Sequence, residues 1–368
     1  MPKFHRDADV SNFCGSTLKV ASFSTLAMAV DYSFQMVDIF WVARIGPGAA
    51  TALAVISTAL YLIFAANEIV GVSSGAVIAQ CHGRGDNRHT GHIILQTLCL
   101  KLALGIGMVA VFALCMVFIL PHYGLKAQEL LYAQEYAVII WLSLLLIPLY
   151  ATMMTCLRVF GMASTSTAIS LGALVANFIL NPLFIFGFGP IPAMGIAGAA
   201  WATIFAQTLT LIVSCFFLIR QPIRIFCRDY LTWWPSHYKK VVLVGLPMGG
   251  AMLLYNLEQI MMTAIVSNLT DSVVSDGFSI GLRIFGLTLM MHFGMSMGVS
   301  VTCGHALGRN DHDLIARSMR RLCIILAGYL AVWSLTLILF ATPIIAAFGT
   351  TGVTLTTGVC FLQMMAIA

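Results

Sequence analysis

The chain has 368 residues, of which 60% are hydrophobic and only 9% are charged, with a formal net charge of +5. A soluble globular domain carries about 25% charged residues, so a surface made from this composition could not be wetted. The composition excludes a water-soluble enzyme, and it also excludes disordered and nucleic-acid-binding chains, which need a high charge density.

Ten apolar runs are long enough to cross a bilayer as helices. Such a helix needs about 20 apolar residues, and backbone polar groups cannot go unpaired in lipid, so runs of this length predict helices. We therefore expect an all-α polytopic membrane protein. Its transmembrane helices are predicted near residues 20–44, 52–80, 98–120, 134–157, 165–188, 195–219, 241–267, 277–303, 322–342 and 353–368.

The two ends of the chain differ in polarity. The first apolar run follows a polar head and predicts a signal anchor rather than a cleaved signal peptide. The last run stops at Ala368 without a polar tail. Because membrane proteins normally end in solvated residues, we expect the chain to be cut within its tenth helix.

Positive charges are distributed unevenly between the two sides of the predicted topology. With the N-terminus inside, only Arg44 and Lys126 lie outside, while Lys101 and Arg283 fall within helices. The remaining basic residues lie inside: Lys3, Arg6, Lys19, Arg84, Arg88, Arg158, Arg220, Arg224, Arg228, Lys239, Lys240, Arg309, Arg317, Arg320 and Arg321. The positive-inside rule therefore predicts a cytoplasmic N-terminus.

An internal repeat relates the two halves of the chain. The sequence GRGD at 83–86 follows the second predicted helix, and GRND at 308–311 follows the eighth. Six helices per copy is an even number, so both copies have the same orientation in the membrane. We expect two six-helix lobes in parallel repeat, with the second one truncated. The N-terminal lobe would span 1–219, a cytoplasmic linker 220–240, and the partial C-terminal lobe 241–368. Two lobes around a cleft are typical of alternating-access transporters.

Four carboxylates fall inside predicted helices, at Asp31, Asp38, Glu68 and Glu258. An ionised carboxylate at mid-bilayer costs about 2.5–3.5 kcal/mol, so residues kept there are candidates for function. Asp31, Gln35 and Asp38 share one face of the first helix, because they are spaced at helical intervals. This stripe must face water or polar partners. It is either an ion- or proton-binding site or a hydrogen-bonded cluster that joins helices.

The fifth predicted helix offers a partner for Asp38. Asn177 and Asn181 lie one turn apart on one face, and Pro182 frees a backbone carbonyl near Phe178. Amide oxygens beside a carboxylate can coordinate Na⁺, or they can accept a hydrogen bond from a protonated acid. Alternatively, the amide pair simply joins two helices.

Other motifs do not point to catalysis. His82, His89 and His92 lie near Cys81 at a predicted loop, where solvation explains them better than a metal site does. We find no Walker A sequence and no catalytic constellation inside the predicted helices. We therefore predict that the chain is not an enzyme and needs no cofactor or structural metal, although Na⁺ would fit at Asp38, Asn177 and Asn181.

Several segments in order resemble the multidrug and toxic compound extrusion (MATE) family. The segments are VDIFWVARIG at 37–46, NFILNPLFIFGFG at 177–189, MGIAGAAWAT at 194–203, the two GRGD/GRND loops, and GLP at 245–247. The resemblance covers essentially the whole chain.

The resemblance implies a secondary active exporter of cationic, amphiphilic compounds, driven by inward Na⁺ or H⁺. It implies a monomer in the bacterial inner membrane. Asp38 would be the cation-coupling residue, Asn177 and Asn181 would help form its site, and Thr203 would complete it. Glu258 would correspond to an acid that some members carry in helix seven.

Three departures from the family pattern are visible. The family usually has twelve helices, whereas ten are predicted here, so helices eleven and twelve are missing. Phe23 stands where members often carry a proline that bends helix one. Asp31 is an extra acid, and with Gln35 and Glu68 it is a secondary candidate site residue. Two other readings stay open: a relative that flips lipid-linked sugars, and a truncated membrane protein that does not transport.

Overall fold

The computed structural model describes residues 3–122, 125–221, 235–269, 272–347 and 351–367. This part of the chain is α-helical, with a single isolated bridge between Phe188 and Ile191. The helices are α1 (Lys3–Val42), α2 (Ala49–Gly83), α3 (Asn87–Leu114), α4 (Ala127–Ile140), α5 (Ser143–Val159), α6 (Ala163–Phe186), α7 (Ile196–Ile219), α8 (Pro235–Leu269), α9 (Ser272–Gly308), α10 (His312–Ala346) and α11 (Gly352–Ile367). A π-helical turn (Cys115–Ile119) and a 3-10 turn (Leu120–His122) extend α3.

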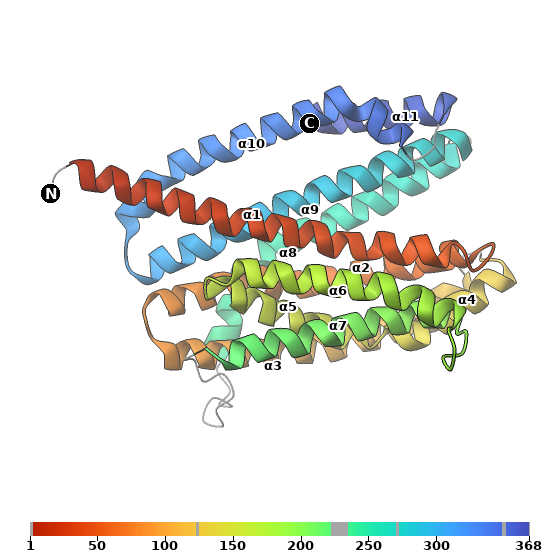
Figure 1. Ribbon diagram of the computed structural model, residues 1–368, viewed down its shortest axis with the longest axis horizontal. Coiled ribbons are helices and arrows are strands. Elements are labelled where there is room, and N and C mark those ends of the chain that lie inside the picture. Colours follow the sequence, from red (N-terminus) through yellow and green to blue (C-terminus); the bar gives the residue numbers. More distant parts are fainter. Residues whose placement is uncertain (1–2, 123–124, 222–234, 270–271, 348–350, 368) are drawn as a thin grey trace.

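The helices run roughly along the long axis of the molecule, with α10 and α11 at the top of Figure 1, α3 and α7 at the bottom, and α1 between them. Within the described residues, six helices are long and apolar enough to cross a membrane, and α4 with α5 makes a seventh if the bent pair is one span. Shorter apolar helices lie at Ala49–Leu60, Ile69–Gly83 and Gly352–Ile367. The prediction of an all-α polytopic membrane protein is confirmed.

Two predicted helix boundaries need correction. The run at 134–157 is not one helix, because α4 and α5 meet at a bend of 47°. The break falls at Trp141 and Leu142, and Pro148 follows within α5, where it cannot donate a hydrogen bond to the carbonyl of Leu144. The first helix begins at Lys3 rather than near residue 20. Its extension is held by packing, since Cys14 is buried against Leu322 of α10.

Helix α1 packs tightly against α9 through small residues. A Cβ added at Gly294 or Gly298 would collide with the backbone of Thr25 or Ala21, respectively. Thr17 also donates a hydrogen bond of 3.0 Å to Thr302. Small residues let helix backbones approach closely in a membrane, so this contact is a broad attachment between the first and second halves of the chain.

A reciprocal contact joins α2 to α9. A Cβ at Gly83 would collide with the backbone of His305, and a Cβ at Gly308 would collide with the backbone of Gln80. The repeat offset of 225 residues relates Gly83 to Gly308 and Gln80 to His305. The contact of Gly83 with His305 is therefore the repeat equivalent of the contact of Gly308 with Gln80. The loops at 83–86 and 308–311 follow directly, and we call this end of the bundle, which carries Arg84 and Arg309, the basic end. The lobe boundaries themselves stay a prediction, and most of the predicted linker (222–234) lies outside the described residues.

Candidate functional site

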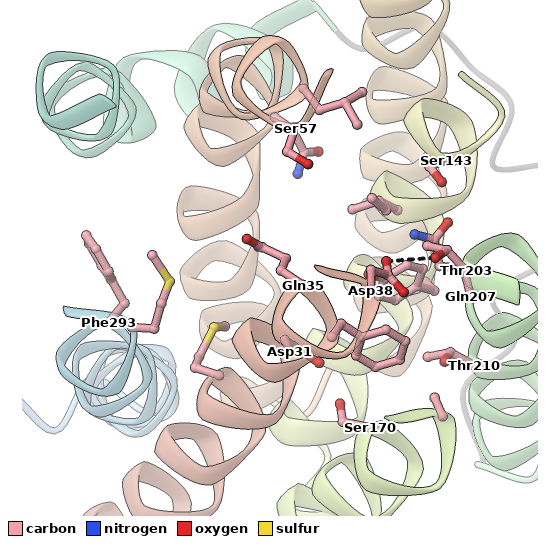
Figure 2. A pocket seen from close by; sticks show the side chains of 18 of the residues that line it. Asp31, Gln35, Asp38, Ser57, Ser143, Ser170, Thr203, Gln207, Thr210 and Phe293 are labelled. Carbon is pink, nitrogen blue, oxygen red and sulfur yellow. Dashed lines mark hydrogen bonds between the residues drawn. The ribbon is translucent and has the colours of Figure 1, made fainter. Parts of the chain in front are cut away.

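A cavity of about 370 Å³ lies between the helices of the two halves, and Figure 2 shows part of its lining. Polar side chains from α1, α6 and α7 form one wall. Met290, Phe293 and Met297 of α9 contribute apolar surface on another side. Both Asp31 and Asp38 line this cavity. The two acids are therefore reached from one space rather than from separate pockets.

The carboxylate of Asp38 is buried, with 7% of the residue exposed, and it is held by two neutral donors. Asn181 donates from Nδ2 to Oδ1 of Asp38 at 2.8 Å, and Thr203 donates from Oγ1 to Oδ2 at 3.0 Å. These bonds tie α1 to α6 and to α7 at one point. The predicted grouping of Asp38, Asn181 and Thr203 is present in the structure.

Asn177 supports this arrangement from one turn earlier on α6. Its Nδ2 lies 3.4 Å from Oγ1 of Thr203, and its backbone and side-chain oxygens each accept from Nδ2 of Asn181 at 3.1 Å. The Oδ1 atom of Asn181 is buried without a hydrogen-bond partner. An unpaired buried acceptor is costly, so this oxygen is positioned to receive a cation or a proton donor.

The connection between α6 and α7 fixes Thr203 relative to the two asparagines. Backbone N–H groups of Met194 and Gly195 bond the carbonyls of Phe184 and Ile185 at 3.0 and 3.1 Å. Gly195 has a φ of +58°, which favours glycine. A Cβ at Gly198 would collide with the carbonyl of Phe184, so the two helices approach as closely as a glycine permits. Thr203 then lies between one and two turns into α7, facing Asp38.

No described cation compensates Asp38. The groups that act on its carboxylate are Asn181, Thr203 and Asn177, all of them neutral. A buried carboxylate with amide and hydroxyl oxygens around it offers hard oxygen ligands, which Na⁺ prefers, and it can equally hold a proton. The arrangement therefore suits reversible capture of a small cation.

Asp31 has different surroundings. Asp31 is exposed to the cavity, which lies inside the helix bundle. Its carboxylate accepts a hydrogen bond from Ser170 and is influenced by the positive charge of Arg158. Arg158 was expected among the solvated charges of the inner side. Instead it is buried in the last turn of α5, where it donates to Thr155 at 3.2 Å and to Ser166 at 3.4 Å.

The other predicted acids do not join this group. Glu258 is exposed on α8 and is absent from the cavity lining, whereas Tyr255 and Asn256 of the same helix do line it. The side chain of Glu68 lies outside the described residues. Gln35 lines the cavity between the two acids of α1. Across the described residues, no cluster of three or more His, Cys, Asp or Glu side chains could hold a metal ion.

Sequence reasoning placed Thr203 at the site by resemblance but missed Gln207 and Thr210 on the same face of α7. All three residues line the cavity, and Oε1 of Gln207 is buried without a partner. Their spacing of four and three residues places them on one helix face. The helical spacing of polar residues within an apolar helix could have identified this face of α7. The same signal identified Asp31, Gln35 and Asp38 on the first helix.

Comparisons with known proteins agree with the fold. The family model described as MatE matches residues 24–183 and 247–368. The probable multidrug resistance protein NorM of Acinetobacter baylyi is 24% identical over 351 residues, covering 88% of this chain and 77% of the relative. The probable multidrug resistance protein YpnP of Bacillus subtilis and the multidrug resistance protein PmpM of Pseudomonas aeruginosa are each 26% identical, covering 77% and 79% of this chain. The chain spans 62% of the length of YpnP and 60% of the length of PmpM.

Solved structures share the same architecture. One, described as the outward-facing conformation of a multidrug resistance MATE family transporter, superposes with a TM-score of 0.84 at 20% identity, covering 96% of this chain and 79% of that one. A MOP superfamily transporter from Pyrococcus furiosus superposes with the same score at 19% identity, covering 96% and 78%. At this identity, the likeness demonstrates the fold alone.

Proposed function

The chain belongs to the MatE family of multidrug efflux transporters, and we propose that it exports cationic organic compounds in exchange for inward-moving Na⁺ or H⁺. We place it in the bacterial inner membrane with its N-terminus and its basic end in the cytoplasm. The curated relatives are bacterial, and the asymmetry of Lys and Arg supports this orientation.

The observation that carries the proposal is the buried, uncompensated Asp38 beside a cavity large enough for an organic molecule. Its carboxylate is bonded only by neutral groups, and an unpaired oxygen of Asn181 lies next to it. An isolated buried charge is expensive, so the site favours a bound cation. We assign coupling-ion binding to Asp38, Asn177, Asn181 and Thr203.

Coupling requires that the ion bind the transporter's conformations unequally. Helix α1 is well placed for this, because it contacts helices of both halves. It packs on α9 through close glycine contacts, and it is tied to α6 and α7 by the two hydrogen bonds of Asp38, besides the bond from Thr167 of α6 to the carbonyl of Phe23. A cation on Asp38 changes the two hydrogen bonds of Asp38 and leaves the contacts with α9 intact. Ion loading would therefore shift α1, together with α9 on which it packs, relative to α6 and α7.

The charge of the cavity favours cationic substrates over lipid-linked sugars. Its described lining includes the two acids Asp31 and Asp38 but no lysine or arginine, whereas a sugar diphosphate would need cationic partners. The Met and Phe side chains of α9 suit apolar substrates of varied shape, since thioethers adapt readily. Glu258 remains a predicted contributor to coupling.

The proposal is tested by dye efflux. Vesicles containing the full protein are loaded with a fluorescent cationic dye, and a Na⁺ gradient and a pH gradient are imposed separately. We expect efflux under one gradient, and we expect Asp38→Asn to reduce it at least tenfold because the ion site is lost. Leu171→Ala, on the lipid-exposed side of α6, is the control that should retain efflux. Efflux that persists unchanged in Asp38→Asn would contradict the assignment of Asp38.

A further inference from the structure

A second acid lies on the same side of α1 as Asp38, nearer the basic end. Asp31 precedes Asp38 by seven residues, which is two turns and about 10 Å along the helix axis. Figure 2 shows both on the side of α1 that faces Ser170, Thr203, Gln207 and Thr210. A small cation released from Asp38 toward the basic end would therefore meet Asp31 within the same cavity.

The cavity is largely apolar, but polar groups of α7 line it near the two acids and it has room for water. Oε1 of Gln207 is buried, with 8% of the residue exposed, and has no partner, so it needs a water molecule or a cation. The hydroxyl of Thr210 donates to its own helix and leaves its lone pairs free. A cavity of about 370 Å³ has room for several water molecules. A hydrated route from Asp38 to Asp31 fits this space.

The electrostatic surroundings of the two acids differ in one respect, which bears on the side from which the cation is released. Asp38 has only neutral partners, whereas Arg158 places a buried positive charge near Asp31. That charge opposes a cation at Asp31, and among the described residues no such charge acts on Asp38. Arg158 is the penultimate residue of α5, just before the short connection to α6, which lies near the basic end because Phe160 packs on His82. A weaker position on the side of the basic end is suited to release in that direction.

We propose that Asp31 is a second, weaker acceptor for the coupling cation, in series with Asp38. This inference rests on the proposed antiport. A proton would leave an oxygen of Asp38, cross the cavity water, and bind an oxygen of Asp31; Na⁺ would exchange its Asp38 ligands for water and then for Asp31. The cation then leaves from Asp31 toward the basic end, and the ionised Asp31 is again stabilised by the charge of Arg158. Ser170 holds the carboxylate in place throughout.

Cation binding to the purified full chain tests this series arrangement. Calorimetric titration with NaCl at alkaline pH counts bound Na⁺, and proton uptake in Na⁺-free solution, followed with a pH indicator, counts bound H⁺. We expect two bound cations of unequal affinity for one of the two ions. Asp31→Asn should lose only the weaker, and Asp38→Asn only the stronger. A single binding event in the unsubstituted protein, or two events that survive in Asp31→Asn, would overturn the proposal.

Two further variants separate cation binding from a structural role. Arg158→Gln removes the opposing charge and should strengthen the weaker event about tenfold. If Asp31 only neutralised Arg158, this substitution would leave cation binding unchanged. Ser33→Ala is the matched control, because Ser33 lies on α1 between the two acids and its hydroxyl bonds only Ala29 of its own helix. Asp31→Glu retains the carboxylate and should keep both events, which covers the case in which Asp31→Asn does not fold.

Dye efflux separates this inference from the function on which it rests. Two bound cations without efflux of any cationic dye would refute the antiport and leave the second position standing. Gradient-driven efflux with one bound cation would support the antiport and refute the second position.

Discussion

Two carboxylates on one face of α1 differ because of what the neighbouring helices bring to them. Asp38 receives hydrogen bonds from α6 and α7, whereas Asp31 receives one from Ser170 and lies near the charge of Arg158. The stripe of Asp31, Gln35 and Asp38 could be predicted from helical spacing alone. The role of Arg158 could not, because its position at a predicted helix end suggested a solvated charge. Only packing in three dimensions buries it beside Asp31.

The link between Asp31 and Arg158 predicts non-additive effects on stability. Asp31→Asn leaves the buried guanidinium without its opposing charge, and Arg158→Gln leaves the carboxylate uncompensated, so each should destabilise the protein. The double variant should lose about 1 kcal/mol less unfolding free energy than the two single variants lose together. The value is modest because cavity water screens Asp31. Thermal unfolding of the four proteins in detergent measures this difference. Strictly additive effects would mean that the two charges do not interact.

At the scale of the elements, periodicity and residue type predicted most of what the structure contains. Long apolar runs predicted the helices, and the spacing of Asn177 and Asn181 predicted their common face. The break between α4 and α5 escaped prediction because hydropathy is continuous across it. The place of Thr203 in the site came from resemblance alone. Spacing cannot say which residue of α7 meets Asp38, because that depends on the approach of α6 and α7 at Gly198.

The close approach of α6 and α7 predicts that Gly198 sets the geometry of the ion site. In Gly198→Val the new side chain would collide with the carbonyl of Phe184, so α7 must move away and take Thr203 with it. We expect a loss of stability of about 1–3 kcal/mol from overpacking, together with weakened cation binding. Thermal unfolding and calorimetric titration measure the two effects. Gly172→Val on α6 is the control, because a Cβ there meets nothing within 4 Å. Equal behaviour of the two variants would show that the contact at Gly198 does not position Thr203.

For the whole molecule, close contacts between the halves lie along α1 and α9, between α2 and α8 where Gly245 and Gly249 meet Ile69, and at the basic end. Thr17 bonds Thr302, and the reciprocal pair of Gly83 with His305 and Gly308 with Gln80 brings α2 and α9 together. In the orientation proposed above, these contacts would close the cavity toward the cell interior. Short glycine contacts hold this closure together with buried apolar side chains of both halves, among them Val77, Ile78 and Val301.

The reciprocal glycine contact predicts a variant that opens the basic end. In Gly308→Val the added side chain would collide with the Gln80 carbonyl, so α2 and α9 cannot approach as they do here. A shift of about 1.4 kcal/mol against the closed form would raise the open population about tenfold where it is the minor state. We expect Cys303, which is half-buried on α9 beside this contact, to react faster with a membrane-impermeant maleimide applied from the cytoplasmic side. Dye efflux should fall, because the open form would be favoured whether or not the ion is bound. Gly328→Val on α10 meets nothing within 4 Å and should leave both measurements unchanged. If Cys303 in Gly308→Val reacts no faster than in the unsubstituted protein, the contact between α2 and α9 is not what closes this end.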